Sequence, residues 1–593
     1  MVSFTHRMAC SAGLAIAACA SVSLAQPYRS IDGTGNNVAH PTWGAANTPM
    51  LRLYPAAYEN GFSTPTGAST QPSARAASLL ACQEGFPDLP ARPLAHTVMQ
   101  WGQFITHDLG FKNTQEPADP FPVPVPSWDT FFDPQGTGTK TLPFFRSKFD
   151  PATGTGPGNP RQQMSFVSSF IDCNTVYGST LSRVAALRTF VDGKLLTQSH
   201  PTGDLLPLNT VLEPMDVSPF GSSNPADLML AGDNRANTQV LLLSVHTIWV
   251  REHNRQCDLL KAANPAWNDE KIYQEARKRV IALNQVVTFN EYLPAILGEF
   301  AIPAYTGYKP AVNPTVSNEF SHAAFRFAHS QTTTLMQRIN EDGTPIPQGT
   351  LRMRDQFFLP QLLMTDGGIE PLLRGMAFQP AQEVDLMTQG DLRNFLYGDP
   401  NSKGHDLAAF DIQRGRDHGL PLYTQARAFA GLPAITTFEQ ISSNPDTVQK
   451  LKNAYTSVNQ IDFWVGGLAE DHVPGSSLGP LFHKIILDDF VRVRDGDRFW
   501  YQNPGEFSPA EVAELHATTF TDVIKRNSSI QYMQANNFFA WPDVDRNYQL
   551  TIDDFITFQT LYAVEDPLAD FDKNGVLNID DFIMFQTVFA LFF

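Results

Sequence analysis

The sequence predicts a mainly α-helical fold, with one large domain that has few short strands and a small C-terminal module. Apolar residues recur with helical spacing from Leu241 to Ala262 and again from Asp269 to about Leu297. Alternation of apolar and polar residues, which marks a half-buried strand, is scarce. An internal repeat begins near residue 541. We therefore expect the large domain to span residues 26–535 and the module to span 541–593.

The first 25 residues have the pattern of a secretion signal. Arg7 ends a short basic start, an apolar stretch follows, and Ser23 and Ala25 provide a small-x-small cleavage site. A lipoprotein signal that leads to Cys19 is the alternative interpretation. No later apolar run reaches the roughly 20 residues that a membrane span needs. We expect a secreted protein that is cleaved after Ala25.

Charge and cysteine content limit the possible partners and the means of stabilisation. The 593 residues include 60 Asp+Glu and 42 Lys+Arg, which gives a net charge of −18 at pH 7. A surface of this sign repels nucleic acid and anionic membranes. Only Cys82, Cys173 and Cys257 follow the signal, an odd number without metal-type spacing. At most one disulfide is possible, so the core must hold the fold.

Proline and glycine mark the connections between the predicted helices. The segment 116–160, rich in Pro, Gly, Phe and Asp, predicts a long loop. It is either a surface insertion or part of the wall of a pocket. Shorter breaks near 303–315, 343–350 and 399–404 separate the later helices.

The segment Trp101–Gly110 contains the first candidate site residues. On a helix, Gln103 and His107 lie four residues apart and share one face. Asp108 points away from that face and is free to serve a different site. A histidine with an amide beside it and a carboxylate behind it suits a redox or metal pocket. Taken alone, however, the segment favours a core histidine, which is the more common role of a histidine on an apolar helix.

A second segment offers oxygen atoms at alternate positions. Ser168, Asp172 and Asn174 carry side-chain oxygens, and the Phe170 carbonyl lies between the first two. Oxygen donors that alternate along an extended loop are able to surround a hard cation. A capped turn is the simpler interpretation of this segment taken alone.

Three later segments combine arginine with histidine or carboxylate. They are Ala231–Arg235 (Ala-Gly-Asp-Asn-Arg), Phe325–His329 (Phe-Arg-Phe-Ala-His) and Phe410–Gly419 (Phe-Asp-Ile-Gln-Arg-Gly-Arg-Asp-His-Gly). Arg326 comes one turn before His329, so both side chains face the same side of a helix.

These five segments, in this order, resemble those of the animal-type haem peroxidase superfamily, of the myeloperoxidase and peroxidasin type. The likeness begins near Arg29, runs through Arg494–Trp500 and fades around residue 535. It implies a secreted haem enzyme that reduces hydrogen peroxide to water while it oxidises a small donor. Phenols, bromide, iodide and thiocyanate are the donors that the resemblance implies.

The resemblance also implies a role for each candidate residue. His107 matches the distal histidine, Arg235 the distal arginine and Gln103 the distal glutamine. Cofactor-binding matches are His329 as the iron ligand, Arg326 on a haem propionate, Asp411 as acceptor of the proximal imidazole N–H, and Arg414. The internal calcium site of the family matches Asp108, Ser168, Phe170 through its carbonyl, Asp172 and Asn174.

The expected chemistry explains why these residue types are needed. A neutral imidazole at His107 removes a proton from one peroxide oxygen and returns it to the other, because its pKa lies near neutrality. The Arg235 guanidinium opposes the negative charge on the departing oxygen. A carboxylate at Asp411 draws on the proximal N–H and makes the iron ligand more electron-donating.

Some positions depart from the mammalian members of the family. Thr106 and Thr238 replace the two carboxylic acids that form ester bonds to haem, and Gln239 replaces the methionine that forms a sulfonium link. We therefore expect haem b without these covalent bonds, which argues against strong halide oxidation, chloride above all. His253 and His418 are interpreted as structural.

The C-terminal repeat places Asp543–Phe555 and Asp570–Phe582 27 residues apart. Oxygen ligands fall at calcium-loop positions 1, 3, 5, 7, 9 and 12 in both copies, although position 12 is Asp rather than Glu. The candidate ligands are Asp543, Asp545, Asn547, Gln549 and Asp554 in the first loop, and Asp570, Asp572, Asn574, Val576 and Asp581 in the second. The pair resembles a dockerin module, which implies two calcium ions and a protein partner or cell-wall anchor.

Two other functions remain open. A fatty-acid dioxygenase of the cyclooxygenase or α-dioxygenase branch shares the scaffold, but Ala324–Ala328 lacks the tyrosine that cyclooxygenases carry before the proximal histidine. A non-catalytic adhesion protein could keep the fold and use the C-terminal loops for attachment. The presence of His107, Arg235 and His329 argues against that alternative.

Overall fold

The computed structural model describes residues 27–85, 92–217, 224–400, 404–540, 542, 544–545, 551–566, 569, 571 and 576–590. The predicted signal peptide lies outside the described residues. So do the predicted C-terminal calcium ligands Asp543, Asn547, Gln549, Asp570, Asp572 and Asn574.

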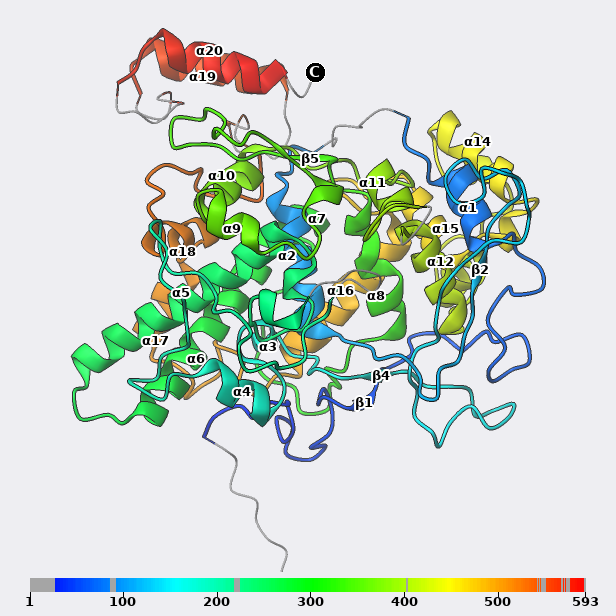
Figure 1. Ribbon diagram of the computed structural model, residues 1–593, viewed down its shortest axis with the longest axis horizontal. Helices are drawn as coiled ribbons and strands as arrows, with labels where there is room; N and C mark the ends of the chain where they lie inside the picture. The colour runs from blue at the N-terminus through cyan, green and yellow to red at the C-terminus, as the bar shows by residue number, and fades with distance from the viewer. Residues whose placement is uncertain are drawn as a thin grey trace, which may run out of the picture.

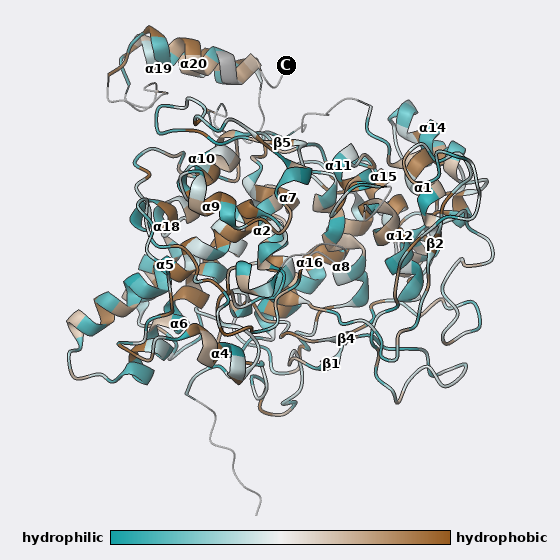
Figure 2. Cartoon of the chain, in the orientation of Figure 1, coloured by the Kyte–Doolittle hydropathy of each residue, from teal (hydrophilic) through white to brown (hydrophobic). Residues whose placement is uncertain are grey.

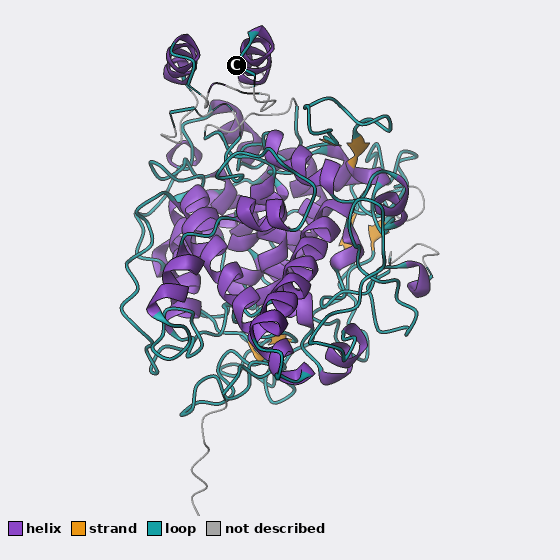
Figure 3. Cartoon of the chain, turned by 90° about the vertical axis from the view of Figure 1, so that its left-hand side faces the viewer, coloured by secondary structure: helices purple, strands orange, loops and turns teal. Residues whose placement is uncertain are grey.

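Helices make up most of the regular structure, as predicted (Figures 1 and 3). In the large body they are α1 (Ala74–Ala81), α2 (Thr97–Leu109), α3 (Asn174–Tyr177), α4 (Leu181–Leu187), α5 (Val240–Ala263), α6 (Asp269–Val287), α7 (Leu293–Leu297), α8 (Asn318–His322), α9 (Gln361–Thr365), α10 (Glu370–Phe378), α11 (Gly390–Asn394), α12 (Leu407–Asp417), α13 (Tyr423–Phe429), α14 (Pro445–Ala454), α15 (Phe463–Ala469), α16 (Pro480–Asp495), α17 (Pro509–His516) and α18 (Phe520–Arg526). Two more, α19 (Ile552–Ala563) and α20 (Ile579–Ala590), follow.

Strands in the described chain are short, which also agrees with the prediction. They form antiparallel pairs of two residues per strand: β1 (Thr48–Pro49) with β4 (Met164–Ser165), β2 (Val123–Pro124) with β3 (Thr141–Leu142), and β5 (Leu335–Met336) with β6 (Leu351–Arg352). The pairs fasten loops, and the core lies among the helices.

The two long helices appear where the apolar spacing predicted them. Gln239 caps α5 by accepting hydrogen bonds from the first backbone N–H groups, and Asn268 caps α6 in the same way. Helix α6 continues through a π-helical turn, η3 (Thr288–Tyr292), into α7. The combined segment Asp269–Leu297 is long and apolar enough to cross a membrane by length and composition, but 89% of its apolar window is buried in the fold, as in a core helix.

Aromatic side chains fix α2 in the centre of the body. Trp101 is fully buried, with ring centroids 4.8 Å from Phe520 and 5.9 Å from Trp249. In Figure 2, α2 lies among other helices and carries both apolar and polar positions. Because this packing fixes α2 near its middle, it also limits the movement of the side chains at the C-terminal end of the helix.

The segment 116–160 is a long loop that contains only the pair β2–β3. It is tied to α1 and α12 by the fully buried Arg75, whose guanidinium lies 2.6 Å from carboxylate oxygens of both Asp129 and Asp406. Cys82, Cys173 and Cys257 are buried free thiols, so packing and ion pairs rather than disulfides hold the described chain.

The C-terminal helices α19 and α20 have their own small core. Phe558 and Phe585 stack with ring centroids 4.0 Å apart, and Phe571 packs against both. In each predicted loop the last carboxylate turns back to the loop's start: Asp554 accepts from the Val544 and Asp545 N–H groups, and Asp581 accepts from Phe571 N–H. In Figure 1 the two helices form a separate layer above β5.

Candidate functional site

Most of the predicted cofactor and catalytic residues meet at one cavity of about 770 Å³. Gln103 and His107 reach it from α2, and Arg235 from the start of the 3-10 turn η2 (Ala236–Thr238). Arg326 and His329 reach it from η4 (Ala324–His329). The volume lies within the roughly 300–1,000 Å³ of small-molecule pockets. Two imidazoles that are distant in sequence therefore line the same cavity.

His107 is held as a neutral imidazole. The residue is only 7% exposed, and burial together with the Arg235 guanidinium lowers its pKa well below the ordinary value, although Asp233 opposes the shift. Nδ1 lies 3.7 Å from an Asp233 carboxylate oxygen and makes no hydrogen bond within the described chain. A neutral ring at the cavity wall is able to accept a proton.

Asp233 and backbone carbonyls hold Arg235 in place. Its Nε and Nη2 donate to the two Asp233 carboxylate oxygens at 2.9 and 2.6 Å. Its Nη1 and Nη2 also donate to the carbonyls of Gly110 and His107, each at 3.0 Å. Such a bidentate pair fixes the plane of the guanidinium. The sequence analysis gave Asp233 no role, although its spacing of two residues from Arg235 was a usable signal.

Amides and hydroxyls line the cavity beside these groups. Gln239 Nε2 donates to the side-chain oxygens of Gln100 and Gln103. Thr106 and Thr238 also line the cavity, and each hydroxyl donates to a carbonyl of its own turn at 2.7 Å. The positions that would need a carboxylate for an ester bond to haem therefore carry hydrogen-bonded hydroxyls.

On the opposite wall, His329 is paired with a carboxylate. Its Nδ1 lies 2.5 Å from Asp411, which also accepts from Arg326 at 2.7 Å. Asp411 is fully buried, which by itself would raise its pKa, but the adjacent His329 and Arg326 lower it overall. The ionised carboxylate orients the ring with Nδ1–H towards Asp411, which leaves Nε2 as the atom available to a metal.

Arg414 is not among the residues that line this cavity. Its Nη1 donates to Asp417 and Ser147, each at 2.8 Å, and its guanidinium lies over the Phe144 ring at 4.0 Å. The buried guanidinium is satisfied by its nearest carboxylate, which explains why the structure does not bring it to the cavity with Arg326.

The predicted internal calcium ligands lie together beside the end of α2. Asp108 Oδ2 accepts from the Asp172 and Cys173 N–H groups at 3.1 Å, and Ser168 donates to Asp172 at 2.7 Å. The Asn174 amide donates to the Asp108 carbonyl. Burial raises the pKa of both carboxyl groups, and each is fully or almost fully buried. Neither carboxylate forms an ion pair with a described residue, so a bound cation would compensate their negative charge.

Phe170 lies fully buried between these donors, with the Arg29 guanidinium 5.2 Å from its ring centroid. The predicted ligand atom is its backbone oxygen, which lies on the same short loop as Ser168 and Asp172. Among the described residues, no group of three or more His, Cys, Asp or Glu side chains converges on a metal position. A cation at this loop would therefore depend on hydroxyl, amide and carbonyl oxygens as well as two carboxylates, as calcium does.

His253 and His418 lie outside the cavity lining. His253 contacts the Tyr177 hydroxyl and the Gly193 carbonyl, and His418 contacts the side chains of Asn318 and Ser147. Both rings are fully buried and hydrogen-bonded at both nitrogens, which is the arrangement expected of structural histidines.

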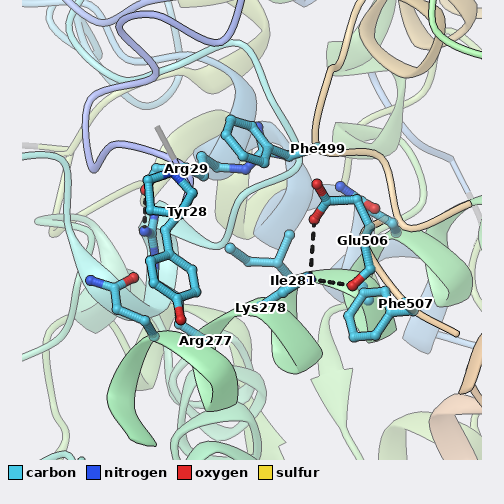
Figure 4. Close-up of a pocket in the computed structure, with 12 residues that line it drawn as sticks. Tyr28, Arg29, Arg277, Lys278, Ile281, Phe499, Glu506 and Phe507 are labelled. Carbon is cyan, nitrogen blue, oxygen red and sulfur yellow. Dashed lines mark hydrogen bonds and ion pairs between the residues drawn. The ribbon is translucent and has the colours of Figure 1, made fainter. Parts of the chain in front are cut away.

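A second cavity lies where the N-terminal segment meets α6 (Figure 4). Tyr28 and Arg29 form one side, and Lys278 and Phe507 close the other. Its volume of about 20 Å³ holds little more than one water molecule. Arg277 donates to the Arg29 carbonyl at 2.7 Å and so holds the N-terminal segment against α6. We interpret this small cavity as a packing gap at that contact.

Two aromatic residues of the main cavity could not be selected from the sequence. Phe358 and Tyr397 have φ of 56° and 65°, and their ring centroids lie 5.4 Å apart at the cavity wall. Bulky side chains rarely adopt this left-handed region, and such strain concentrates at binding sites. Backbone angles of this kind leave no signal in the residue types.

Comparison with known proteins agrees with this geometry. The family model described as Animal haem peroxidase matches residues 28–539. Peroxinectin A from Dictyostelium discoideum is 38% identical over 529 residues, which cover 87% of this chain and 97% of that protein. Peroxidasin from Drosophila melanogaster is 38% identical over 549 residues, or 85% of this chain but 36% of that protein, so the chain spans only about a third of peroxidasin.

Solved structures show the same relationship. Peroxidase A from Dictyostelium discoideum superposes with a TM-score of 0.81 at 37% identity and covers 87% of this chain and 100% of its own. A fatty acid alpha-dioxygenase from Arabidopsis thaliana has a TM-score of 0.73 at 19% identity over 87% of this chain and 83% of its own, a likeness of fold alone. The family match ends before α19, so it does not include the C-terminal helices. The chain belongs to the animal haem peroxidase family and is a peroxide-reducing oxidoreductase of that family.

Proposed function

We propose that the protein is a secreted peroxidase that reduces hydrogen peroxide to water and oxidises a small donor, namely a phenol, bromide, iodide or thiocyanate. The observation that carries this proposal is the placement of a neutral His107, with Arg235 clamped beside it, in the same cavity as the carboxylate-bound His329.

The cavity fits haem. Its walls present the neutral imidazole of His107 and the imidazole of His329, which is hydrogen-bonded through Nδ1. The rest of the lining includes His322, Phe320, Phe325 and Leu396. Such a lining suits a flat apolar ring. Bound haem supplies the redox centre, and His329 would hold its iron through Nε2.

The chain's own residues handle the proton and the charge. His107 takes a proton from one oxygen of hydrogen peroxide and returns it to the other, because its lowered pKa keeps the ring unprotonated at neutral pH. Arg235 stabilises negative charge on the departing oxygen, and its bonds to Asp233 and two carbonyls mean that it need not reorganise. Asp411 keeps the Nδ1 proton of His329 in place.

A donor panel tests the proposal. Haem-replete protein is mixed with hydrogen peroxide and, separately, guaiacol, bromide, iodide or thiocyanate, and peroxide consumption is followed. We expect at least one donor to be oxidised in a peroxide-dependent reaction. Oxygen uptake with linoleate in the absence of peroxide would favour a dioxygenase instead, and no peroxide-dependent oxidation of any donor would favour an adhesion protein.

The described cavity offers no carboxylate at the ester positions. Thr106 and Thr238 line it as hydroxyls, and Asp216 is the single carboxylate among the lining residues. We infer that the haem is held by His329, by contacts to its carboxylates and by burial.

The loop beside α2 is proposed as a calcium site. Asp108 and Asp172 are buried next to each other, and the ion would neutralise them and fix the neighbouring His107. The donor set, two carboxylates with hydroxyl, amide and carbonyl oxygens, suits calcium rather than a softer metal.

The C-terminal helices are proposed as a calcium-loaded attachment module, similar to a dockerin, for a protein partner or the cell wall. One observation favours attachment: the two repeats expose apolar residues at equivalent positions. Ile552 and Ile579 are 62% and 61% exposed, and Ile556 and Ile583 are 52% and 53% exposed. Isoleucines exposed at matched positions of both repeats are apolar side chains that a partner would cover.

Removal of calcium is expected to make stability depend on pH. Burial raises the pKa of Asp108 and Asp172 above the ordinary value of about 3.9. Without a cation the stability of the folded state is therefore full below that value and is lost as the pH rises through the raised pKa values. Calcium should abolish this loss, because the ionised pair is then neutralised. Thermal unfolding with chelator or calcium, from pH 4 to 8, measures the effect.

Two controls belong to this prediction. Asp172→Asn removes one of the two coupled carboxyl groups, so the chelated variant should lose less stability with pH than the chelated wild type. Calorimetric titration should find about three calcium ions per wild-type chain, one at this loop and two at the C-terminal repeat, and one fewer in the variant. If stability depends on pH equally with and without calcium, the proposed calcium site beside α2 is contradicted.

A further inference from the structure

Lys112 is a cavity cation for which the described chain provides no partner. It lies in the extended segment just after α2 and lines the cavity together with Asp216, His322 and Arg326. Its side chain is partly buried and makes no hydrogen bond or ion pair with any residue that the structure describes. Neither the sequence motifs nor the family match assigns it a role.

The other cations of the cavity wall are already neutralised. Arg235 is paired with Asp233, and Arg326 with Asp411. Asp216, the single carboxylate among the lining residues, forms no ion pair with Lys112. Buried charges in proteins are normally paired, so the Lys112 wall of the cavity is short of one anion.

The electrostatic surroundings of Lys112 also favour the binding of an anion. Burial lowers the pKa of its ammonium well below the ordinary value, and Arg414 and Arg326 lower it further. An anion in the cavity beside Lys112 and Arg326 would restore the lysine's charge and receive a charge-assisted hydrogen bond. The lysine has no bond to a described residue that it would lose when such an anion binds.

We propose that Lys112 binds a carboxylate of the haem. Haem carries two carboxylates on one edge, and the structure offers two cations from opposite walls: Arg326 from η4, which also carries His329, and Lys112 from the segment that follows His107. Arg326 uses Nε and Nη1 within the chain, so its Nη2 stays available for one carboxylate. Lys112 takes the other. The inference rests on the haem of the proposed function.

The test compares haem with its dimethyl ester, in which both carboxylates are blocked. Full-length wild type and Lys112→Met are loaded with each ligand, and transfer to excess apomyoglobin is followed by absorption, without peroxide or donor. Lys112→Met should release haem about 10- to 100-fold faster than wild type, as expected for a lost hydrogen bond to a charged group. The two proteins should release the dimethyl ester at the same rate, and Lys112→Arg should restore much of the retention of haem.

Lys148 supplies the matched control. It is an exposed lysine on the neighbouring segment, where its backbone N–H donates to the Asn113 carbonyl at 2.8 Å and its ammonium lies 5.6 Å from the Phe166 ring centroid. Lys148→Met should release haem at the wild-type rate.

Three outcomes would overturn the inference: unchanged haem release in Lys112→Met, an equal increase for haem and ester, or a higher KM for thiocyanate with unchanged haem release. The last would assign Lys112 to an anionic donor. Should Lys112→Met not fold, Lys112→Gln takes its place, with the same expected result of faster release of haem and unchanged release of the ester. Lysine-dependent haem retention in a protein that oxidises no donor would contradict the proposed function and leave this inference standing.

Discussion

Replacing His107 with alanine is expected to slow the reaction with hydrogen peroxide by about 10²- to 10⁴-fold while the haem stays bound. The variant loses the only histidine of the α2 wall of the cavity. Arg235 keeps its place, because its bonds are to Asp233 and to backbone carbonyls, and the substitution leaves all of these in position. Stopped-flow absorption after mixing with peroxide measures the rate directly.

The pH profile of the same reaction distinguishes a proton-transfer role of His107 from a purely structural one. Burial and the Arg235 charge hold the pKa of His107 well below its ordinary value. The wild-type rate should therefore stay constant from pH 8 to below the ordinary histidine pKa of about 6.5, and fall only when the ring finally becomes protonated. His107→Ala should show no such fall.

His40→Ala is the matched control for this substitution. His40 is an exposed histidine that stacks on Trp43 with ring centroids 3.8 Å apart, and it does not line the cavity. Its variant should react with peroxide at the wild-type rate. A His107→Ala protein that reacts as fast as His40→Ala would refute the assignment of His107 as the base.

Local patterns predicted much of the fold. The helices over 240–263 and 269–297 were predictable because their apolar spacing is regular and their ends are capped by nearby side chains. The positions of the two-residue strands were not, because so short a strand shows no alternation of apolar and polar residues, and β1 pairs with β4 across more than 100 residues. The C-terminal helices were indicated by repetition alone.

The site was predictable only where a residue's role is tied to its neighbours in sequence. Helical spacing separated the directions of His107 and Asp108, but the roles expected of these residues and of Arg235 came from the resemblance of the five segments to a known family. The importance of Asp233 is visible only in its bidentate bond to Arg235 and in its approach to His107. Lys112 stands out only because the neighbouring cations of the cavity already have partners. Arg414 shows the opposite case, since long-range packing gave it Asp417 instead of the cavity. Such facts depend on three-dimensional proximity, which spacing does not encode.

Replacing His329 with alanine is expected to remove most of the haem, so that the Soret absorbance per chain falls by roughly tenfold or more. His329 is the only histidine of the η4 wall, and Asp411 orients its ring through a 2.5 Å hydrogen bond. Metal ligands held in this way dominate cofactor retention. Purified variant and wild type, matched for chain concentration and for circular dichroism, give the comparison, with His40→Ala as the control.

The result depends on the chain's departures from ester-forming relatives. With Thr106 and Thr238 at the two ester positions, release is opposed by the His329 bond, by the haem carboxylate contacts and by burial rather than by ester bonds. Free imidazole should partly restore haem binding to His329→Ala, because it replaces the missing ring beside Asp411. Extraction of wild type with acidified butanone should likewise leave a colourless polypeptide. If haem instead stays with the denatured chain and with His329→Ala, a covalent bond exists, and Asp216, as the one carboxylate lining the cavity, becomes the residue to replace with asparagine.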